Sequence, residues 1–415
     1  MIVRKIHPEE YKRVKQFCSL AFEYPMDGCD LTPQETFDKL IQNPHSRGDI
    51  HWQERWAAFE DDDRTMMSSF LVIPYNVNFD GHTAGMGGIG GVATLPQYRR
   101  RGGVRACFEK ALPDMYEQGM AFSYLYPFST AFYRKFGYEL GCERTLCKIK
   151  LIRTPDYDID GTFHLLEPGT DLTHDIRRVY DVWQKRYNMM TADEELEFKW
   201  VKESDPFRDK VYTYVYRNAQ DVPKAVVTYV PSKEEGDREL AFATLDCTRR
   251  FWFTDVEGFC ALIHLLKRLS ADHSHITFYL PTDVELGALM PEWSFLAVQR
   301  QQQLNGMVRV INVEQVLKMA KMRGNGDLVI EIKDQQIVQN NGRFAVSFSE
   351  GCENRVERTP KEADISLTIQ DFSRLICGRY NIEDLFWLPD VNLHCTPEKA
   401  AKVFYRKPFH ITRYF

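Results

Sequence analysis

Several features that would assign a sequence to a membrane, secreted or metal-binding class are missing from this chain. No run reaches the ~20 apolar residues that span a membrane, and the opening MIVRKIHPEEYKR contains no apolar signal core. The ten cysteines are scattered and form no Cys-x-x-Cys pair, so the common cysteine-based metal and redox motifs are absent. We therefore expect a cytoplasmic protein with reduced, mostly buried cysteines, no bound metal and no membrane partner.

An excess of positive charge is also missing. The chain has 53 Lys and Arg against 59 Asp and Glu, a formal net charge of -6, and a pI of about 6.0. This balance argues against a general nucleic-acid binder, so any basic site must be local. The histidines do not predict a metal site, because His273 and His275 are expected in a polar turn without supporting carboxylates or cysteines.

What the 415 residues do contain is enough sequence for two or three domains. Near the start, hydrophobic spacing predicts a helix followed by strands, and Asp80-Gly81 is a strong hairpin signal. A helix with apolar residues at helical spacing follows, then a strand and a short helix. The expected segments are 9–22, 51–60, 66–79, 83–95, 104–119, 121–126 and 129–136. Residues 151–165 resemble a linker, and a second α/β unit of similar order and a third unit from about 290 follow.

The most informative stretch is LPQYRRRGGVRACFEKAL, residues 95–112, at the start of a predicted helix. Free N–H groups and the helix dipole attract phosphate at such a position. Gly102 and Gly103 allow close approach to the main chain, and Arg100, Arg101 and Arg105 can add charge-assisted hydrogen bonds. The turn suits a pyrophosphate, although a solvated basic face beside turn glycines is the plain alternative. It is neither a Walker A loop nor a dinucleotide-binding turn, because no Gly-Lys-Ser/Thr follows and the preceding strand belongs to an antiparallel hairpin.

Together with SYLYPFSTAFYRKFGYE, this turn resembles the acetyl-CoA signature of the GNAT N-acetyltransferases, Arg/Gln-x-x-Gly-x-Gly/Ala. Here it reads Arg99-x-x-Gly102-x-Val104, with valine where the family usually has glycine or alanine. With this departure the turn resembles that of the enhanced intracellular survival (Eis) branch, which also reads RRRG. The resemblance implies an α+β chain: two tandem GNAT-like α/β domains, the second degenerate, then a sterol-carrier-protein-type-2-like domain. The implied ranges are 1–150, 151–288 and 289–415.

The resemblance also implies where acetyl-CoA, the expected co-substrate, binds. The strand ending in Val92, Ala93 and Thr94 would pair with the pantetheine arm and place a backbone N–H at the acetyl oxygen. The arginine–glycine turn would hold the pyrophosphate, and residues after the neighbouring strand would complete the cleft, although core packing is an equal explanation for Phe128. The residues implied beyond the strand are Arg100, Arg101, Gly102, Gly103, Val104, Arg105, Phe128 and Ser129.

Two residues are implied to move protons. Tyr133, in STAFYRKFGY, matches the family tyrosine aimed at the CoA sulfur; a phenol with an ordinary pKa of about 10 is protonated at pH 7. Tyr124, Tyr126 and Tyr138 are nearby competitors. Phe415 matches the family's aromatic last residue, whose α-carboxylate accepts the amine proton, and the ending HITRYF favours a docked strand over a frayed tail.

The acceptor is implied to be an amine of an aminoglycoside-like molecule, a polyamine or a lysine side chain. Its pocket would be acidic and partly aromatic, and the candidates by chain order are Phe22, Glu23, Tyr24 and Asp27. Two other functions remain open: a carrier of apolar ligands, and an acetyl-CoA sensor without turnover. A carrier would not need the arginine–glycine turn, and a sensor would not need Tyr133. The resemblance further suggests a homo-hexamer, with Phe251, Trp252 and Phe253 suited to burial between subunits.

Overall fold

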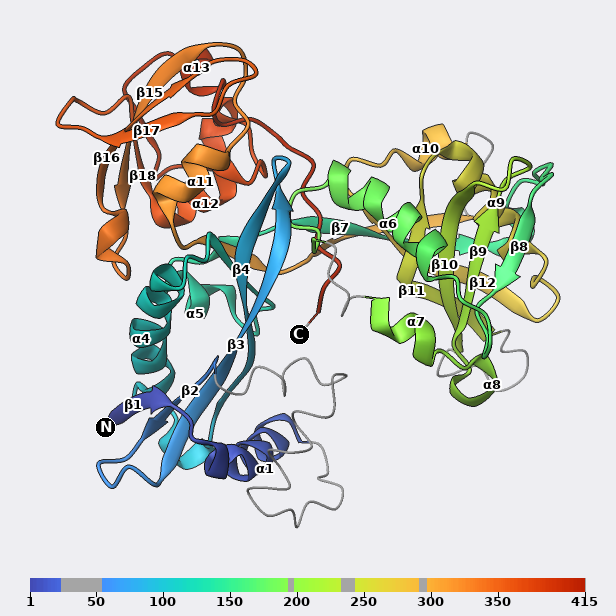
Figure 1. Cartoon of the computed structure of the whole chain (residues 1–415), viewed down its shortest axis with the longest axis horizontal. Helices are drawn as coiled ribbons and strands as arrows, with labels where there is room; N and C mark the ends of the chain where they lie inside the picture. Colours follow the sequence, from blue (N-terminus) through green and yellow to red (C-terminus); the bar gives the residue numbers. More distant parts are fainter. Residues whose placement is uncertain (24–53, 193–197, 233–242, 291–296, 415) are drawn as a thin grey trace. The chain divides into compact units, whose positions relative to one another are not determined.

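The computed structural model describes residues 1–23, 54–192, 198–232, 243–290 and 297–414 (Figure 1). The chain forms two compact units, each built from separate stretches of the sequence. Unit 1 contains Met1–Cys142, Gly306–Lys407 and Thr412–Phe415; unit 2 contains Glu143–Asn305 and Pro408–Ile411. The predicted boundary at 150 therefore falls inside unit 2, where the strand β7 (Glu143–Lys150) already pairs with that unit's sheet. The three predicted domain ranges remain predictions.

Unit 1 is built on a seven-stranded sheet with the order β1-β2-β3-β4-β5-β14-β6. Its strands are β1 (Ile2–Lys5), β2 (Arg55–Phe59), β3 (Met66–Phe79), β4 (His82–Thr94), β5 (Phe122–Leu125), β6 (Glu139–Leu140) and β14 (Met307–Val310). The predicted hairpin is confirmed, since Asp80 and Gly81 both adopt positive φ between the paired residues Phe79 and His82.

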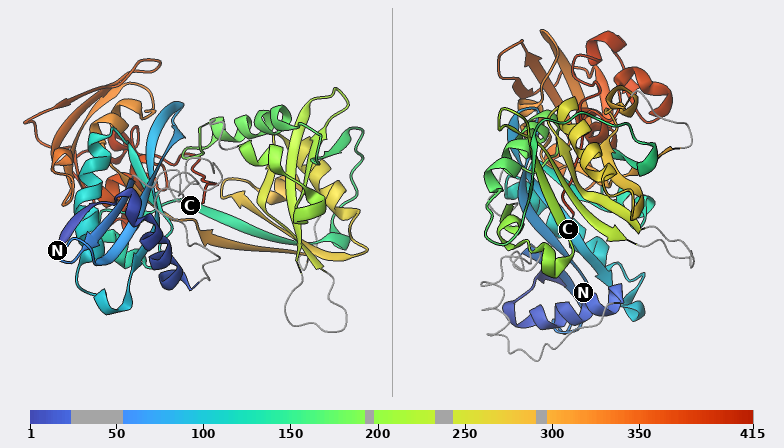
Figure 2. Two further views of the ribbon diagram at one scale, coloured as in Figure 1. Left: turned by 60° about the horizontal axis from the view of Figure 1, so that its bottom comes forward. Right: turned by 90° about the vertical axis from the view of Figure 1, so that its right-hand side faces the viewer.

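Helices cover both faces of this sheet (Figure 2). The helix α1 (Tyr11–Phe22) shares a core with Ala57 and Phe59, whereas α4 (Gly103–Glu117) shares one with Trp56 and Ala58. Because successive strand residues point to opposite faces, the two helices lie on opposite sides. A third helix, α5 (Thr130–Arg134), follows β5 and joins the α4 side, where its Tyr133 ring packs edge-on against Phe108 with centroids 6.2 Å apart.

The C-terminal part of unit 1 adds a five-stranded sheet with the order β17-β16-β15-β18-β19. Its strands are β15 (Gly326–Lys333), β16 (Gly342–Phe348), β17 (Arg355–Arg358), β18 (Ile365–Thr368) and β19 (Asn392–Leu393), and its helices are α11 (Val313–Met319), α12 (Ile369–Ile376) and α13 (Pro397–Ala400). The preceding strand β14 does not join this sheet; it pairs antiparallel with β5 and β6.

Unit 2 contains another seven-stranded sheet, with the order β13-β7-β12-β11-β10-β9-β8. Its other strands are β8 (Thr162–Leu165), β9 (Tyr212–Arg217), β10 (Pro223–Ser232), β11 (Ala243–Phe253), β12 (His273–Pro281) and β13 (Val298–Leu304), and its helices are α6 (Thr173–Arg186), α7 (Lys199–Glu203), α8 (Pro206–Asp209), α9 (Val256–Lys267) and α10 (Leu286–Leu289). As in unit 1, an antiparallel series ends in a parallel pair, β11 with β12, and a helix connects the two.

Three local predictions are wrong. His273 and His275 lie in the strand β12 rather than in a turn, because the alternating residues Ile276, Phe278 and Leu280 are buried in the core. The 151–165 segment is not only a linker, since it contains β8. Phe251 and Trp252 are buried inside unit 2, so they do not form a surface for contacts between subunits.

The expected burial of cysteine is largely confirmed, since six of the nine described cysteines are buried and all nine are free. Nowhere in the described ranges is a helix both long enough and apolar enough to cross a membrane.

Candidate active site

The turn between β4 and α4 forms an open, positively charged helix start. Arg100 adopts φ +66°, and Gly102, the N-cap residue of α4, adopts φ +86°. Among the described residues no side chain caps this helix, and its first turn contains no acidic residue. The first N–H groups of a helix have no partner within it, so those of Gly103, Val104 and Arg105 are available to an anion.

The two glycines of the turn have different roles. A Cβ on Gly102 would meet no atom of the described chain within 4 Å, so space lies in front of it and its need for glycine is the left-handed backbone. A Cβ on Gly103 would lie 2.4 Å from Ser68 Oγ, so this glycine lets the helix start pack closely on β3.

The arginines of the turn also differ. Arg101 is engaged with Glu60, with Nη1 2.6 Å from Oε1 and Nη2 3.2 Å from Oε2. Arg100 and Arg105 make no ion pair with any residue in the described part of the chain. No described residue compensates their charges at the helix start, which makes them the stronger candidates for anion contacts.

This turn lines a cleft of about 830 Å³. The cleft is bounded by α1, the end of β4, the turn, and the segment around α5. Its walls comprise Ala21, Phe22, Val92, Ala93, Thr94, Tyr98, Arg99, Arg100, Arg101, Gly102, Gly103, Val104, Arg105, Phe128, Phe132, Lys135 and Phe136. The residues predicted to bind acetyl-CoA therefore lie together, except Ser129, whose hydroxyl instead caps α5 by accepting from the Phe132 N–H.

The end of β4 presents an open backbone edge. Its parallel pairing with β5 ends at Ile89 and Leu125, whereas β4 itself continues to Thr94. Gly91, at φ +58°, interrupts the register with β3 on the other side. The diverging strands leave residues 92–94 without a β5 partner, as an extended ligand arm requires.

Tyr133 lies immediately behind the cleft wall. Its side chain is 2% exposed, and its ring packs edge-on against Phe128 and Phe132, with centroids 5.4 and 5.1 Å away. Phe128 itself is 72% exposed, so the core-packing explanation for that residue is wrong. Burial, followed by the effect of Tyr138, raises the pKa of Tyr133 well above its ordinary value, which keeps the hydroxyl protonated at neutral pH.

The three competing tyrosines are engaged elsewhere. The hydroxyl of Tyr138 is 2.7 Å from Ser123 Oγ, and that of the fully buried Tyr124 is 3.6 Å from Cys142 Sγ. The hydroxyl of Tyr126 donates to the carbonyl oxygen of Arg413. These contacts leave Tyr133 as the tyrosine of this group with a hydroxyl that bonds to no other described residue.

Sequence reasoning missed one cation and several aromatic residues of the cleft. Phe132, Lys135 and Phe136 share its wall, as does Tyr98 in the turn, and Arg99 of the acetyl-CoA signature lines the cleft as well. The spacing of 132, 135 and 136 corresponds to one face of a helix, so a helical reading of STAFYRKF contained this signal. Of the predicted acceptor residues, Phe22 lines the cleft, Glu23 ends α1 at φ +55°, and Tyr24 and Asp27 lie outside the described residues.

The last described residues contact the sheet of unit 1. The Tyr414 ring stacks on Tyr126 with centroids 4.6 Å apart, and the Arg413 guanidinium lies 4.1 Å from the centre of the Tyr75 ring. Together with the Tyr126 hydrogen bond, these contacts hold the 413–414 backbone beside the end of β5. Phe415 itself lies outside the described residues.

Comparison with known families assigns two domains. The model of the acetyltransferase (GNAT) domain matches residues 2–141, and that of the sterol carrier protein domain matches residues 313–410. The chain thus has a GNAT domain at its N-terminal end and a sterol carrier protein domain at its C-terminal end. The prediction of an N-acetyltransferase is confirmed at the level of the enzyme class, and GNAT domains use acetyl-CoA as their acetyl donor.

Solved structures share the fold over the full chain. A probable N-acyltransferase from Enterococcus faecalis has a TM-score of 0.81 at 21% identity, covering 100% of this chain and 99% of its own. A GCN5-related N-acetyltransferase from Anabaena variabilis has a TM-score of 0.82 at 16% identity, with 100% of both chains covered. Eis1 from Mycobacterium abscessus has a TM-score of 0.77 at 18% identity, also with both chains fully covered. At these identities the likeness concerns the fold, and none of the curated proteins compared with the chain matches it.

Proposed function

We propose that this protein is an Eis-like N-acetyltransferase that binds acetyl-CoA in the described cleft and transfers its acetyl group directly to an amine. The observation that carries the proposal is the start of α4, which opens onto the cleft with no cap and with two arginines that pair with no charge among the described residues. The fold shared with Eis1 supports the finer assignment. When bound, acetyl-CoA supplies the acetyl group as an activated thioester.

Each structural element of the cleft has its own proposed role in binding acetyl-CoA or in transferring the acetyl group. The first N–H groups of α4, with Arg100 and Arg105, would hold the pyrophosphate, and Lys135 adds a further positive charge. The open edge at Val92–Thr94 would pair with the extended arm and orient a backbone N–H at the acetyl oxygen. Tyr133 would hold a proton for the departing sulfur, since its pKa is raised by burial.

For the general base we propose the α-carboxylate of Phe415. The support is the docking of residues 413–414 on Tyr126, which belongs to the same segment as the cleft residue Phe128. A terminal carboxylate has an ordinary pKa of about 3.3–3.7 and is ionised at neutral pH, so it can attract a cationic amine and accept its proton.

We propose amines on small polycations or lysine side chains as acceptors, entering beside Phe22. The test is a CoA-release assay with aminoglycosides, polyamines and lysine peptides, followed by mass spectrometry of the products. An added mass of one acetyl group on an amine supports the proposal. Binding of acetyl-CoA without CoA release from any amine would favour a sensor instead. The proposed hexamer is tested separately by light scattering after size-exclusion chromatography.

A further inference from the structure

The C-terminal domain, which here means β14 together with the sterol carrier protein region of residues 313–410, contributes β14 to the GNAT sheet. Met307 to Val310 pair antiparallel with Leu125 to Phe122 of β5, and Met307 and Val308 pair with Leu140 and Glu139 of β6. The strand that precedes the sterol carrier protein domain therefore separates β5 from β6. These are the two strands that flank α5 along the chain, so side chains of the C-terminal domain have direct access to that helix.

Three of those side chains cap the end of α5. The carbonyl oxygens of Arg134, Lys135 and Phe136 each accept a hydrogen bond from the C-terminal domain. Their donors are Gln370 Nε2 at 2.9 Å, Gln336 Nε2 at 3.4 Å and Arg309 Nη1 at 2.7 Å, respectively. Arg134 is the last residue of α5, and Lys135 and Phe136 follow it directly. The Arg134 carbonyl also accepts from the Gly137 N–H at 3.0 Å. Three consecutive carbonyls where the helix ends are therefore held by side chains from a distant part of the chain.

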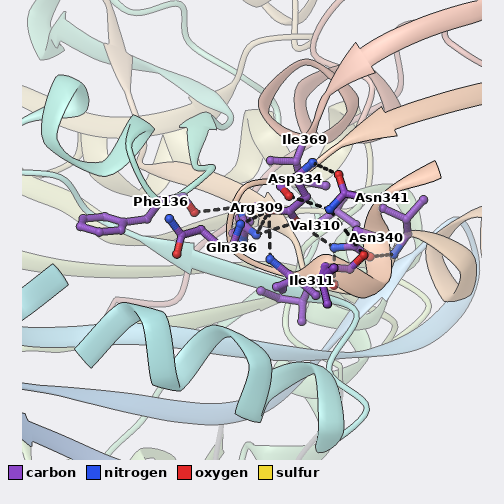
Figure 3. A network of polar contacts seen from close by, with 12 residues as sticks. Phe136, Arg309, Val310, Ile311, Asp334, Gln336, Asn340, Asn341 and Ile369 are labelled. Atoms are coloured by element: carbon purple, nitrogen blue, oxygen red, sulfur yellow. Dashed lines mark hydrogen bonds and ion pairs between the residues drawn. The ribbon is translucent and has the colours of Figure 1, made fainter. Parts of the chain in front are cut away.

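Arg309 is held rigidly in this position. Its Nη2 contacts both carboxylate oxygens of Asp334, at 2.8 and 2.7 Å, and both side chains are 0% exposed (Figure 3). Asn340 Nδ2 donates to the same carboxylate at 2.9 Å, as does the Gln336 N–H. A fully buried ion pair whose carboxylate accepts further hydrogen bonds restricts the guanidinium to a narrow range of orientations, so Nη1 is a well-positioned donor.

The residue after the capped carbonyls confirms how close this contact is. Gly137 adopts φ +83°, and a Cβ there would lie 1.4 Å from Arg309 Nη1. Glycine is required both by the backbone and by the guanidinium. The path of the chain out of α5 is thus adapted to the arginine of the C-terminal domain.

From these contacts we infer that Arg309, Gln336 and Gln370 are positioning residues that hold α5, and with it Tyr133, against the cleft. The helix has five residues, too few to be stable without tertiary contacts. It nevertheless carries Tyr133 and contributes Phe132 to the cleft wall. The C-terminal domain therefore completes the acetyl-transfer site from behind. This inference rests on the proposed acid role of Tyr133.

The test replaces two caps by side chains of similar length that cannot donate. In the double variant Gln336→Met/Gln370→Met, we expect kcat to fall about tenfold, because small misplacements of a reacting group are costly. The Kd for acetyl-CoA should change less than threefold, since its phosphate contacts come from α4. Amide hydrogen exchange of residues 130–137 should accelerate. The matched control is Gln335→Met, whose exposed side chain bonds to none of the described residues; it should behave as the wild type.

A double-mutant cycle with Tyr133→Phe separates this inference from the function on which it rests. If the caps act through Tyr133, the double variant should lose little further kcat in the Tyr133→Phe background. Fully additive losses, or unchanged kcat in the double variant while Tyr133→Phe alone is strongly impaired, would overturn the inference. Wild-type kcat in Tyr133→Phe alone would instead refute the proposed acid role, and the catalytic part of this inference with it. Arg309→Lys keeps a donor and a charge beside Asp334 and should retain more kcat than Arg309→Met.

Discussion

The two seven-stranded sheets share one arrangement of strands and connecting helix, but the start of that helix is open in unit 1 and capped in unit 2. In each, the last antiparallel strand leads into a helix and then into a parallel neighbour. The helix α4 begins at a glycine without a cap, whereas α9 begins at Asp255, whose carboxylate accepts from the Gly258 N–H at 3.0 Å and pairs with Lys224 Nζ at 2.6 Å. In unit 2 a protein carboxylate thus takes the position that unit 1 leaves open to an anion.

The space beside the diverging strands differs in the same way. In unit 2, Phe251 of β11 stacks on Phe278 of β12 with ring centroids 4.0 Å apart, whereas unit 1 has the cleft at the end of β4. The helix after β12, α10, has the sequence LGAL and no tyrosine. A shared fold therefore does not carry the function; particular residues at the strand ends do.

If the chemistry belongs to unit 1 alone, the largest effect should come from the chain end that docks there. Adding a short peptide after Phe415 should abolish acetyl transfer, because the proposed carboxylate becomes an amide, while acetyl-CoA still binds. The same peptide placed before Met1 is the control, and CoA release with calorimetric titration is the measurement. Full activity of the C-terminally extended protein would move the base into the first domain, with Glu23 the next candidate.

The second largest effect is expected at Tyr133, because the corresponding helix of unit 2, α10, contains no tyrosine. Tyr133→Phe removes one hydroxyl and preserves the ring contacts with Phe128 and Phe132, so kcat should fall by roughly 10²–10⁴ with little change in acetyl-CoA affinity. Steady-state kinetics and a binding titration measure the two quantities. A loss below threefold would assign the proton to water.

A third change tests the open helix start. In Gly102→Val the new Cβ would meet no atom of the described chain within 4 Å, and the side chain would occupy the space assigned to phosphate. Losing one or two charge-assisted hydrogen bonds should raise the acetyl-CoA KM by roughly tenfold to a hundredfold. Gly119→Val, at the other end of α4, introduces the same positive-φ strain with similarly open space and should leave KM unchanged. Equal effects of both variants would mean that strain, not the ligand site, is being measured.

Acid should lower the folding stability of unit 2 through a buried histidine. His410 lies among the rings of Trp183 and Tyr187, and burial, with the Arg144 charge, lowers its pKa to about 3. Between this value and about 6.5 the unfolded chain binds the extra proton. Stability is therefore full above pH 6.5 and falls as pH falls, by about 2 kcal/mol at pH 5. Denaturant unfolding at pH 7.5 and 5.0 should show this loss in the wild type and not in His410→Phe; an equal loss in both would exclude His410.

The smallest effect is expected from removing the cap of the second helix. Asp255→Ala should destabilise the protein by about 1 kcal/mol, the usual value for an N-cap, measured by denaturant unfolding. Acetyl-CoA affinity should not change, since α9 presents no ligand site. New acetyl-CoA binding to unit 2 in this variant would show that the cap alone separates the two helix starts.

The sequence predicted much of the first domain and less of the rest. Strands 66–79 and 83–95 and the helix after Arg101 were readable because Asp80-Gly81, the glycines and the apolar spacing are local signals. His273 and His275 were misplaced because strand β12 depends on its partners in the sheet. The insertion of β14 beside β5 could not be predicted, since the paired residues Leu125 and Met307 lie 182 positions apart in the sequence.

By itself, then, the sequence determined the features that depend on neighbouring residues: the hairpin, the arginine–glycine turn at a helix start, and a tyrosine on the short helix that follows. Tertiary structure alone decided which arginine of the turn pairs with a described carboxylate, because the partner of Arg101 is Glu60, just after β2. It also decided that Phe128 is exposed, that β14 completes the first sheet, and that Arg309 caps α5. The physical reason is that charge pairing, burial and capping depend on distances between distant segments, which folding brings together.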